Sequence, residues 1–375
     1  MNRDQDGPSP HVQMVDLFAG PGGLDVAAQW LGVAAAGIEW DANACTTRRA
    51  AELQTERGDV RTFGPDKFAG AKILTGGPPC QTYTVAGNGN GRRALTEVVR
   101  AAEAMAAGED VVELFTDRDV RTRLVLEPLR WVLQAHEAGE DYESIVLEQV
   151  PAVLPVWKTI QKVLKSIDYS CECAIFRTEE FGVPQTRRRA ILIARKNAQV
   201  VLPRPTHHPY RRGVARGTGD ESLMPWRTMG ETLDRSTPYT VISNYGTGGD
   251  PKKRGERTSD EPAFTVTGKV SRNRVRAADG RFGRFDFREA GMLQTFPHDY
   301  PWSGHDVAQQ IGNAIPPRLA VHVLAAALGR QVDNASLDLA VTRSWRDADI
   351  DSPLVRSMPM PMPMPTVTEQ EPTHS

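Results

Sequence analysis

Residues 11–40 read HVQMVDLFAGPGGLDVAAQWLGVAAAGIEW, and this stretch decides the fold of the chain. An apolar run with β-branched residues, 11–18, predicts a buried strand that ends in a Gly-Pro-Gly-Gly turn. A helix-like stretch follows over 24–31, then a second strand over 34–40 and its helix over 41–53. A strand, a glycine turn, a helix and a second strand in this order are typical of a βαβ unit in a parallel sheet.

The same alternation continues through the first half of the chain. Further buried strands are expected at 72–74, 144–150 and 190–194. We therefore predict an α/β fold with a Rossmann-like, mostly parallel sheet and helices on both faces. After Lys196 proline, glycine, arginine and threonine become frequent and helical periodicity fades, which predicts a smaller, irregular, β-rich domain over 197–284.

The two ends of the chain differ from the part between them. Residues 1–11 are polar and are expected to be a disordered leader. Helix-like patterns return over 285–332, which is expected to rejoin the first domain, 12–196. The remaining residues, 333–375, are expected to be a tail that is largely disordered from about residue 352, because alternating Met-Pro cannot continue a helix or a central strand.

The composition is that of a globular protein. Of 375 residues, 40% are hydrophobic, 25% charged and 7% aromatic, which excludes a collagen, a coiled coil and a fully disordered chain. The formal charge of −2 excludes a globally basic nucleic-acid binder, but not a locally basic face. No signal-peptide core and no apolar run of about 18 residues is visible, so no membrane span is expected. The four cysteines (Cys45, Cys80, Cys171 and Cys173) suit neither a disulfide scaffold nor a zinc site, which predicts a reduced, cytoplasmic setting and no metal.

Three features together indicate a nucleoside site at the carboxyl edge of the sheet. The glycine turn at 20–23 lets backbone amides approach a ligand, although its spacing is not that of dinucleotide-binding proteins. Glu39 closes the second strand, where a carboxylate can bind ribose hydroxyls, and Trp40 offers a flat face for a purine. Asp59 is able to accept from an adenine amino group. Each feature alone has an ordinary structural explanation, so the indication comes from their combination.

Catalytic candidates stand at other predicted strand ends. Cys80 follows Gly-Gly-Pro-Pro, and this rigid frame with polar Gln81 argues against the usual role of a cysteine as a small buried hydrophobe. Glu148 ends an apolar strand, where a carboxylate is costly unless it is functional or paired; by itself, a structural pair with an arginine is favoured. Arg187 and Arg189 are expected to share one face of a strand and to bind phosphates or order Glu148, the alternative being a solvated charge run.

Six segments, in this order, resemble the motifs of the cytosine-C5 DNA methyltransferase family. They are DLFAGPGGLD from residue 16, GGPPCQ ending at 81, EQV at 148–150, QTRRR at 185–189, REAGMLQTFP at 288–297 and QIGNAIPP at 310–317. The resemblance covers most of residues 12–330. A single match can arise by chance, whereas six in sequence order are highly specific.

The resemblance implies a large domain for cofactor and catalysis and a small target-recognition domain, which corresponds to 197–284. It implies S-adenosylmethionine as the cofactor and no metal. The catalytic residues that it implies are Cys80, Gln81, Glu148, Arg187 and Arg189. The cofactor-binding residues that it implies, together with the features above, are Phe18, Gly20, Gly22, Gly23, Leu24, Glu39, Trp40, Asp59, Val60, Pro79, Asn313 and Ala314.

The chemistry of the family implies that Cys80 adds to C6 of a cytosine flipped out of duplex DNA while Glu148 protonates or hydrogen-bonds N3, so that C5 can accept a methyl group. This chain departs from the family pattern in two residues. Gln149 stands where asparagine is usual and supports the nucleophile loop, and Tyr83 stands where phenylalanine is common. Over 87–123, where the family has a mobile loop, a long helical-looking segment predicts an inserted helix.

Local charge indicates a DNA partner. Between Lys252 and Arg288 there are eleven Lys/Arg against five Asp/Glu, an excess that fits phosphate binding. The DNA-binding candidates within this segment are Lys269, Arg272, Arg274 and Arg276. The same chemistry on transfer RNA and a catalytically inactive DNA-binding regulator are the alternatives; the basic segment favours DNA, and retention of the catalytic residues argues against inactivity. We expect a monomer in a bacterial or phage-infected cytoplasm, with a cognate restriction endonuclease as a further candidate partner.

Overall fold

The computed structural model describes residues 11–79, 90–109, 123–236, 238–246, 254–347 and 355–357. Its centre is a seven-stranded sheet with strand order β3-β2-β1-β4-β5-β7-β6, in which β7 alone runs against its neighbours. The strands are β1 (Met14–Leu17), β2 (Ala35–Glu39), β3 (Thr55–Arg57), β4 (Ile73–Gly76), β5 (Ser144–Gln149), β6 (Ser170–Arg177) and β7 (Arg188–Arg195). The predicted mostly parallel α/β sheet is confirmed.

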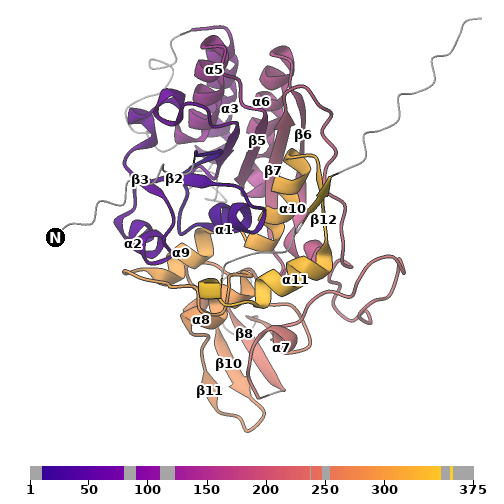
Figure 1. The fold of residues 1–375 in the computed structure, drawn as a ribbon. Coiled ribbons are helices and arrows are strands. Elements are labelled where there is room, and N and C mark those ends of the chain that lie inside the picture. The colour runs from indigo at the N-terminus through magenta and orange to yellow at the C-terminus, as the bar shows by residue number, and fades with distance from the viewer. Residues whose placement is uncertain are drawn as a thin grey trace, which may run out of the picture.

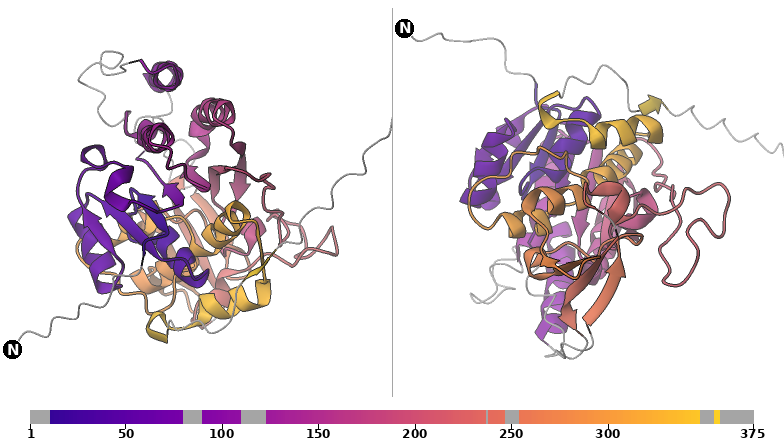
Figure 2. Two further views of the ribbon diagram at one scale, coloured as in Figure 1. Left: turned by 45° about the horizontal axis from the view of Figure 1, so that its top comes forward. Right: turned by 90° about the horizontal axis from the view of Figure 1, so that it is seen from below.

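Helices cover both faces of this sheet (Figures 1 and 2). One face packs on α1 (Gly23–Trp30) and α10 (Pro317–Ala327), and the other on α3 (Asn90–Ala106), α5 (Glu127–Glu137) and α6 (Leu154–Ser166). Neighbouring residues of one strand enter opposite cores: Met14 joins the first cluster and Val15 the second. This period of two is what makes strands that are buried on both faces read as continuous apolar runs. The helix α3 lies within the 87–123 segment where we expected one; the rest of that expectation falls outside the described residues.

The apolar run Val307–Leu328 is long enough, by length and composition, to cross a membrane, but 89% of an 18-residue apolar stretch within it is buried inside the protein. It comprises α9 (Val307–Asn313) and α10, two helices that meet at the Ala-Ile-Pro-Pro turn. Within the described residues, no other stretch passes the same test. Its hydropathy therefore reflects a central place in the core.

A second sheet is antiparallel, with strand order β11-β10-β8-β9. Its strands are β8 (Tyr239–Gly246), β9 (Arg254–Thr258), β10 (Arg274–Ala277) and β11 (Phe282–Gly283). Its own core takes side chains from α7 (Met229–Thr232), α8 (Phe287–Leu293) and α9. The helix α9 therefore packs on the second sheet, whereas α10 packs on the first.

The domain boundaries expected at residues 196 and 284 stay a prediction. After α10 the chain forms β12 (Arg330–Val332) and α11 (Asn334–Thr342), and β12 pairs with β13 (Val355–Ser357). Most of the expected disordered tail lies outside the described residues. The helix α2 (Ala42–Ala50) begins at Asp41, whose carboxylate accepts from two amides of the first turn.

Candidate active site

A cavity of about 700 Å³ opens at the carboxyl ends of the parallel strands. It is walled by the turns after β1 and β4 and by the ends of β2 and β5, with the loop after α9 on the opposite side. The carboxyl edge is where ligands bind in open α/β sheets, because the turns that follow the strands diverge there. Sequence segments far apart in the chain thus contribute to one site.

The glycine turn is built around Glu39. The N–H of Gly20 donates to one carboxylate oxygen of Glu39 (2.7 Å) and the N–H of Asp41 to the other (2.6 Å). Burial raises the pKa of Glu39. Gly20 has a φ of 55°, a conformation that glycine adopts without strain. The carboxylate expected to bind a ribose therefore also fixes the turn that faces the ligand.

All but one of the residues predicted to bind the cofactor line this cavity. Those that line it are Phe18, Gly20, Gly23, Leu24, Glu39, Trp40, Asp59, Val60, Pro79, Asn313 and Ala314. Gly22 is not among them, and its role in cofactor binding stays a prediction. It precedes α1 with a φ of 108°, and a Cβ there would lie 2.3 Å from Cδ1 of Leu53. Glycine is needed at this position for conformation and packing.

Trp40 and Asp59, the candidates for binding the purine, differ in exposure and in side-chain partners. Trp40 is 67% exposed, which is high for a tryptophan, and it lines the cavity. Asp59 is engaged: its carboxylate pairs with Arg61 at 2.5 Å, and hydrogen bonds from Arg61 lower the pKa of Asp59. Each oxygen of Asp59 accepts two hydrogen bonds from Arg61, so an adenine amino group would compete with Arg61 for this carboxylate.

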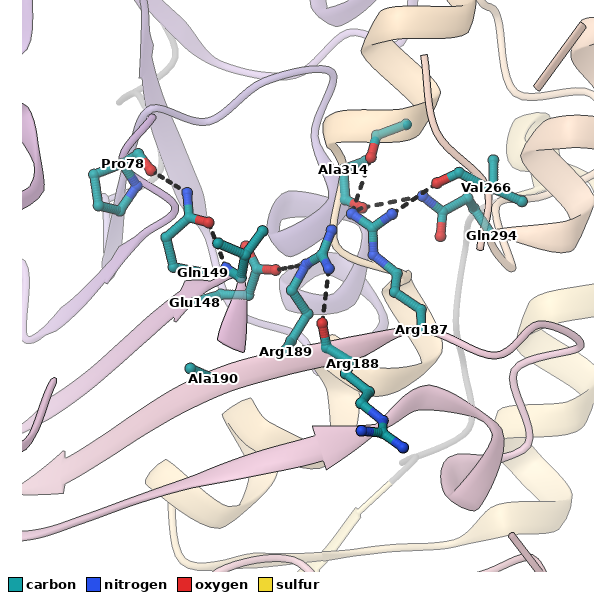
Figure 3. Close-up of polar contacts among 12 residues, drawn as sticks. Pro78, Glu148, Gln149, Arg187, Arg188, Arg189, Ala190, Val266, Gln294 and Ala314 are labelled. Atoms are coloured by element: carbon teal, nitrogen blue, oxygen red, sulfur yellow. Dashed lines mark hydrogen bonds and ion pairs between the residues drawn. The ribbon is translucent and has the colours of Figure 1, made fainter. Parts of the chain in front are cut away.

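Glu148 and Arg189 form an ion pair on the wall of the same cavity (Figure 3). Arg189 Nε lies 2.5 Å from Glu148 Oε1, and both side chains are largely buried. The guanidinium is held in turn by the carbonyl of Arg188, at 2.7 Å. The arginine-paired and the functional interpretations of Glu148 are therefore compatible: the carboxylate is paired and it also faces the cavity.

Gln149 connects β5 to the segment that leads to Cys80. Its Nε2 donates to the carbonyl of Pro78 at 2.5 Å, and its Oε1 accepts from the N–H of Val150 (Figure 3). This amide thus supports the turn after β4, the role that asparagine has in the family. Cys80, Gln81 and Tyr83 lie outside the described residues, and the described part of the loop ends at Pro79 on the cavity wall.

Arg187 is not among the residues that line the cavity, and its expected role beside Arg189 stays a prediction. Its guanidinium is fully buried and donates to the carbonyls of Val266 (2.8 Å), Gly312 (2.9 Å) and Ala314 (3.2 Å). Burial lowers the pKa of Arg187 well below its ordinary value. Arg187 and Arg189 extend to the same side of the chain, as expected, and Arg188 extends to the other (Figure 3).

Two buried glutamines next to Arg187 were not among the predicted site residues. Gln185 Nε2 donates to the carbonyl of Leu293 (2.8 Å) and to Oε1 of Gln294 (2.7 Å). Gln294 Nε2 donates to the carbonyls of Ile311 (2.6 Å) and Ala314 (3.1 Å). Both glutamines belong to the motif segments, and their place in those segments was the available signal.

The four DNA-binding candidates lie on or next to the second sheet and differ in exposure and in side-chain partners. Lys269, Arg272 and Arg274 are exposed. Arg274 stacks on Phe282, its Cζ 3.8 Å from the ring centroid, and Arg276 pairs with Glu256 at 3.1 Å. Among the described residues no group of three or more His, Cys, Asp or Glu side chains could hold a metal ion.

Solved structures share this fold. A methyltransferase of Entamoeba histolytica, EhMeth, superposes with a TM-score of 0.57 at 14% identity, covering 85% of this chain and 98% of that one. The S. pombe Dnmt2 methyltransferase gives 0.56 at 18% identity, over 84% and 98%. The fold and the cavity thus define an α/β protein with a ligand cavity at the carboxyl edge of its sheet.

Sequence comparison identifies the family. Residues 12–102 and 144–212 match the family described as C-5 cytosine-specific DNA methylase. The type II methyltransferase M1.HphI of Haemophilus parahaemolyticus is 27% identical, over 84% of this chain and 86% of its own. The type II methyltransferase M.Eco47II of Escherichia coli is 25% identical, over 83% and 77%. The chain belongs to the C-5 cytosine-specific DNA methylase family and is a cytosine-C5 DNA methyltransferase.

Proposed function

We propose that this enzyme transfers a methyl group from S-adenosylmethionine to C5 of a cytosine within a specific duplex DNA sequence, through a covalent bond between Cys80 and C6. One observation carries the proposal. The residues expected to bind the cofactor and the pair Glu148–Arg189 line the same cavity, and Pro79, which directly precedes Cys80, lies on its wall.

The residues of the cavity fit S-adenosylmethionine. A nucleoside with an amino-acid arm needs a cavity of several hundred Å³, a carboxylate near the ribose and an aromatic face, and the glycine turn, Glu39 and Trp40 supply them. When bound, this group supplies an electrophilic methyl carbon on a sulfonium. Trp40 and, in competition with Arg61, the carboxylate of Asp59 would hold its adenine.

The chain's own groups make the cytosine reactive. Attack of the Cys80 sulfur on C6 forms a C–S bond and moves an electron pair toward C5, which alone is a poor nucleophile. A proton held by Glu148 at N3 offsets the charge that develops on the ring. After C5 has gained the methyl group, loss of its proton to a base restores the C5–C6 double bond and expels the thiolate. Arg189 holds Glu148 in place for this task.

The target base must leave the helix before it can enter the cavity. Unstacking costs roughly a few kcal/mol, which protein–DNA contacts have to offset. The basic segment of the second sheet is the candidate for those contacts, with Lys269, Arg272 and Arg274 exposed. We propose 197–284 as the target-recognition domain on this basis. We propose that the enzyme acts as a monomer, because one recognition domain is enough to bind a short target sequence. We also propose that it is a cytoplasmic enzyme encoded by a bacterium or a phage.

Methyl transfer from tritiated S-adenosylmethionine tests the function directly. Wild type and Cys80→Ala are incubated with duplex DNA and, separately, with transfer RNA. We expect label in DNA with wild type only. Label in RNA alone would move the substrate to RNA, and label in neither would favour a regulator without catalysis. Duplexes that contain 5-fluorocytosine test the covalent step, because they should trap wild type and not Cys80→Ala.

A further inference from the structure

Two glycines meet where the segment before β10 crosses α9. A Cβ on Gly312 would lie 2.2 Å from the nitrogen of Gly268 and 2.3 Å from the carbonyl carbon of Thr267. A Cβ on Gly268 would lie 2.1 Å from Oε1 of Gln309. Neither glycine has a positive φ, so close approach, and not backbone conformation, requires the absence of a side chain at both positions.

Arg187 holds the same crossing from the buried side. One guanidinium nitrogen donates to the carbonyl of Val266 and another to that of Gly312, and the N–H of Val266 donates to Gln185 at 2.9 Å. A planar guanidinium presents its donors in a fixed fork. The two backbones are therefore held at one separation by a rigid group that water does not reach.

The crossing joins two functional parts of the molecule. On one side Gln309 and Gly312 line the cavity. On the other side the chain continues directly through Lys269 and a 3₁₀ turn that ends at Arg272, both exposed, into β10 of the second sheet. This turn also packs on α9. Lys269 and Arg272, which are expected to hold DNA, thus follow within four residues of Gly268, the point where the chain contacts the cavity wall.

We propose that the crossing of Gly268 on Gly312, clamped by Arg187, is a positioning junction that sets DNA bound on the second sheet at the correct distance from the cavity. The inference rests on the proposed function. Both glycines are positioning residues: they act through the backbone, and the effect falls on bound DNA more than on free cofactor. A displacement of about 1 Å at a reacting centre can cost about 10²-fold in rate, so a methyl group between the two backbones is large enough to matter.

Alanine at each glycine tests the junction. We expect Gly312→Ala to lower kcat/KM for duplex DNA by about 100-fold, because its Cβ meets backbone atoms that cannot turn away. Gly268→Ala should lower it about 10-fold, since the side chain of Gln309 can rotate. Lys162→Ala in α6 is the control: Lys162 is exposed and lies outside both the cavity lining and the second sheet, and no change is expected. S-adenosylmethionine affinity, from calorimetric titration, should stay that of wild type in Gly268→Ala.

A double variant separates positioning from misfolding. Gln309→Ala removes the two nearest atoms, Oε1 and Cδ, and leaves only Cα at 3.2 Å from the added methyl group, so the Gly268→Ala/Gln309→Ala enzyme should regain most of the kcat/KM that separates Gly268→Ala from wild type. Wild-type kcat/KM in both single glycine variants, no recovery in the double variant, or an equal loss of cofactor affinity in Gly268→Ala would each overturn the junction. If wild type itself fails to methylate DNA, the proposed function falls instead, which this series shows in its first measurement.

Discussion

The cavity wall at Glu148 and the junction at Arg187 lie side by side, yet they are built from opposite kinds of interaction. At the wall a carboxylate meets Arg189, and the pair faces the space where chemistry is proposed. At the junction Arg187 meets only backbone carbonyls. The two arginines of one motif therefore differ in their contacts. Arg189 pairs with a carboxylate on the cavity wall, whereas Arg187 links two chain segments through their backbone carbonyls.

The largest expected effect tests the wall. Glu148→Gln keeps the shape but removes the group that holds a proton at N3, so kcat for DNA should fall about 10²- to 10⁴-fold, the usual contribution of acid–base catalysis. Cofactor affinity should remain, because the glycine turn and Trp40 are untouched. Single-turnover transfer of tritium into duplex DNA measures the rate. A fall of less than threefold would mean that Glu148 is only a structural partner of Arg189.

Exchanging each arginine for alanine sharpens the contrast. Arg187→Ala leaves buried carbonyls without donors and should lower the free energy of unfolding by about 3 kcal/mol, with a fall in Tm of about 4 °C. Arg189→Ala should cost less stability, because its pair lines the cavity and water can replace the guanidinium, but it should reduce kcat. Thermal unfolding and methyl transfer on both variants provide the comparison. Equal losses of stability would contradict the division of roles.

A buried carboxyl without its own arginine extends the comparison to pH. Asp16 is held by the hydroxyl of Thr75 at 2.7 Å, while Arg48 is engaged bidentately by Asp25. Burial, with repulsion from Asp25, raises the pKa of Asp16 well above its ordinary value. The folded state thus binds this proton more tightly than the unfolded state, so stability is greatest below about pH 4 for this group and declines as pH rises through the raised pKa.

The measurement is urea unfolding of wild type and Asp16→Asn at several pH values between 5 and 8. Asn carries no titrating proton, so the contribution of this group to the decline should vanish and the variant should show the shallower slope. Asp59→Asn serves as a contrast, because hydrogen bonds from Arg61 lower the pKa of Asp59 and its contribution is lost only as pH falls below about 4. Parallel slopes for Asp16→Asn and wild type would refute the argument.

The smallest effect is expected at Gln149. Gln149→Ala removes the hydrogen bond to the carbonyl of Pro78 and should lower kcat several-fold, since one supporting bond is worth about 1 kcal/mol. Gln149→Asn, which restores the residue usual in the family, should retain more activity than alanine because it keeps the amide. Steady-state rates on the same duplex rank the three enzymes. An alanine variant as active as wild type would remove Gln149 from the support of the nucleophile loop.

The positions of the residues expected to bind the cofactor were largely predictable from sequence, because many of them stand directly after a predicted strand. The strands expected at 34–40, 144–150 and 190–194 appear at Ala35–Glu39, Ser144–Gln149 and Arg188–Arg195. Glu39 stands at the end of its strand, and strand ends of a parallel sheet share one edge. The short β3 was not foreseen, since three residues without an apolar pattern give no periodicity to detect.

Partners that come from distant segments were not predictable. Alternation predicted that Arg187 and Arg189 share one face, as Figure 3 shows, but it could not show that Arg187 donates to carbonyls of distant segments. The sequence identified the glutamines at 185 and 294 as motif letters without showing that they contact each other across 109 residues of chain. It also gave no reason for glycine at 268.

The sequence by itself determined the family, the parallel sheet and the residue types of the cavity, because each follows from local order along the chain: apolar periodicity, a glycine turn and six motifs in register. Only the tertiary structure decided which arginine faces the cavity, that Gly22 serves packing, and that the second sheet is fixed to the cavity wall at Gly268 and Gly312. Those outcomes depend on which backbone atoms from remote segments come within a few ångströms, and no local pattern encodes that separation.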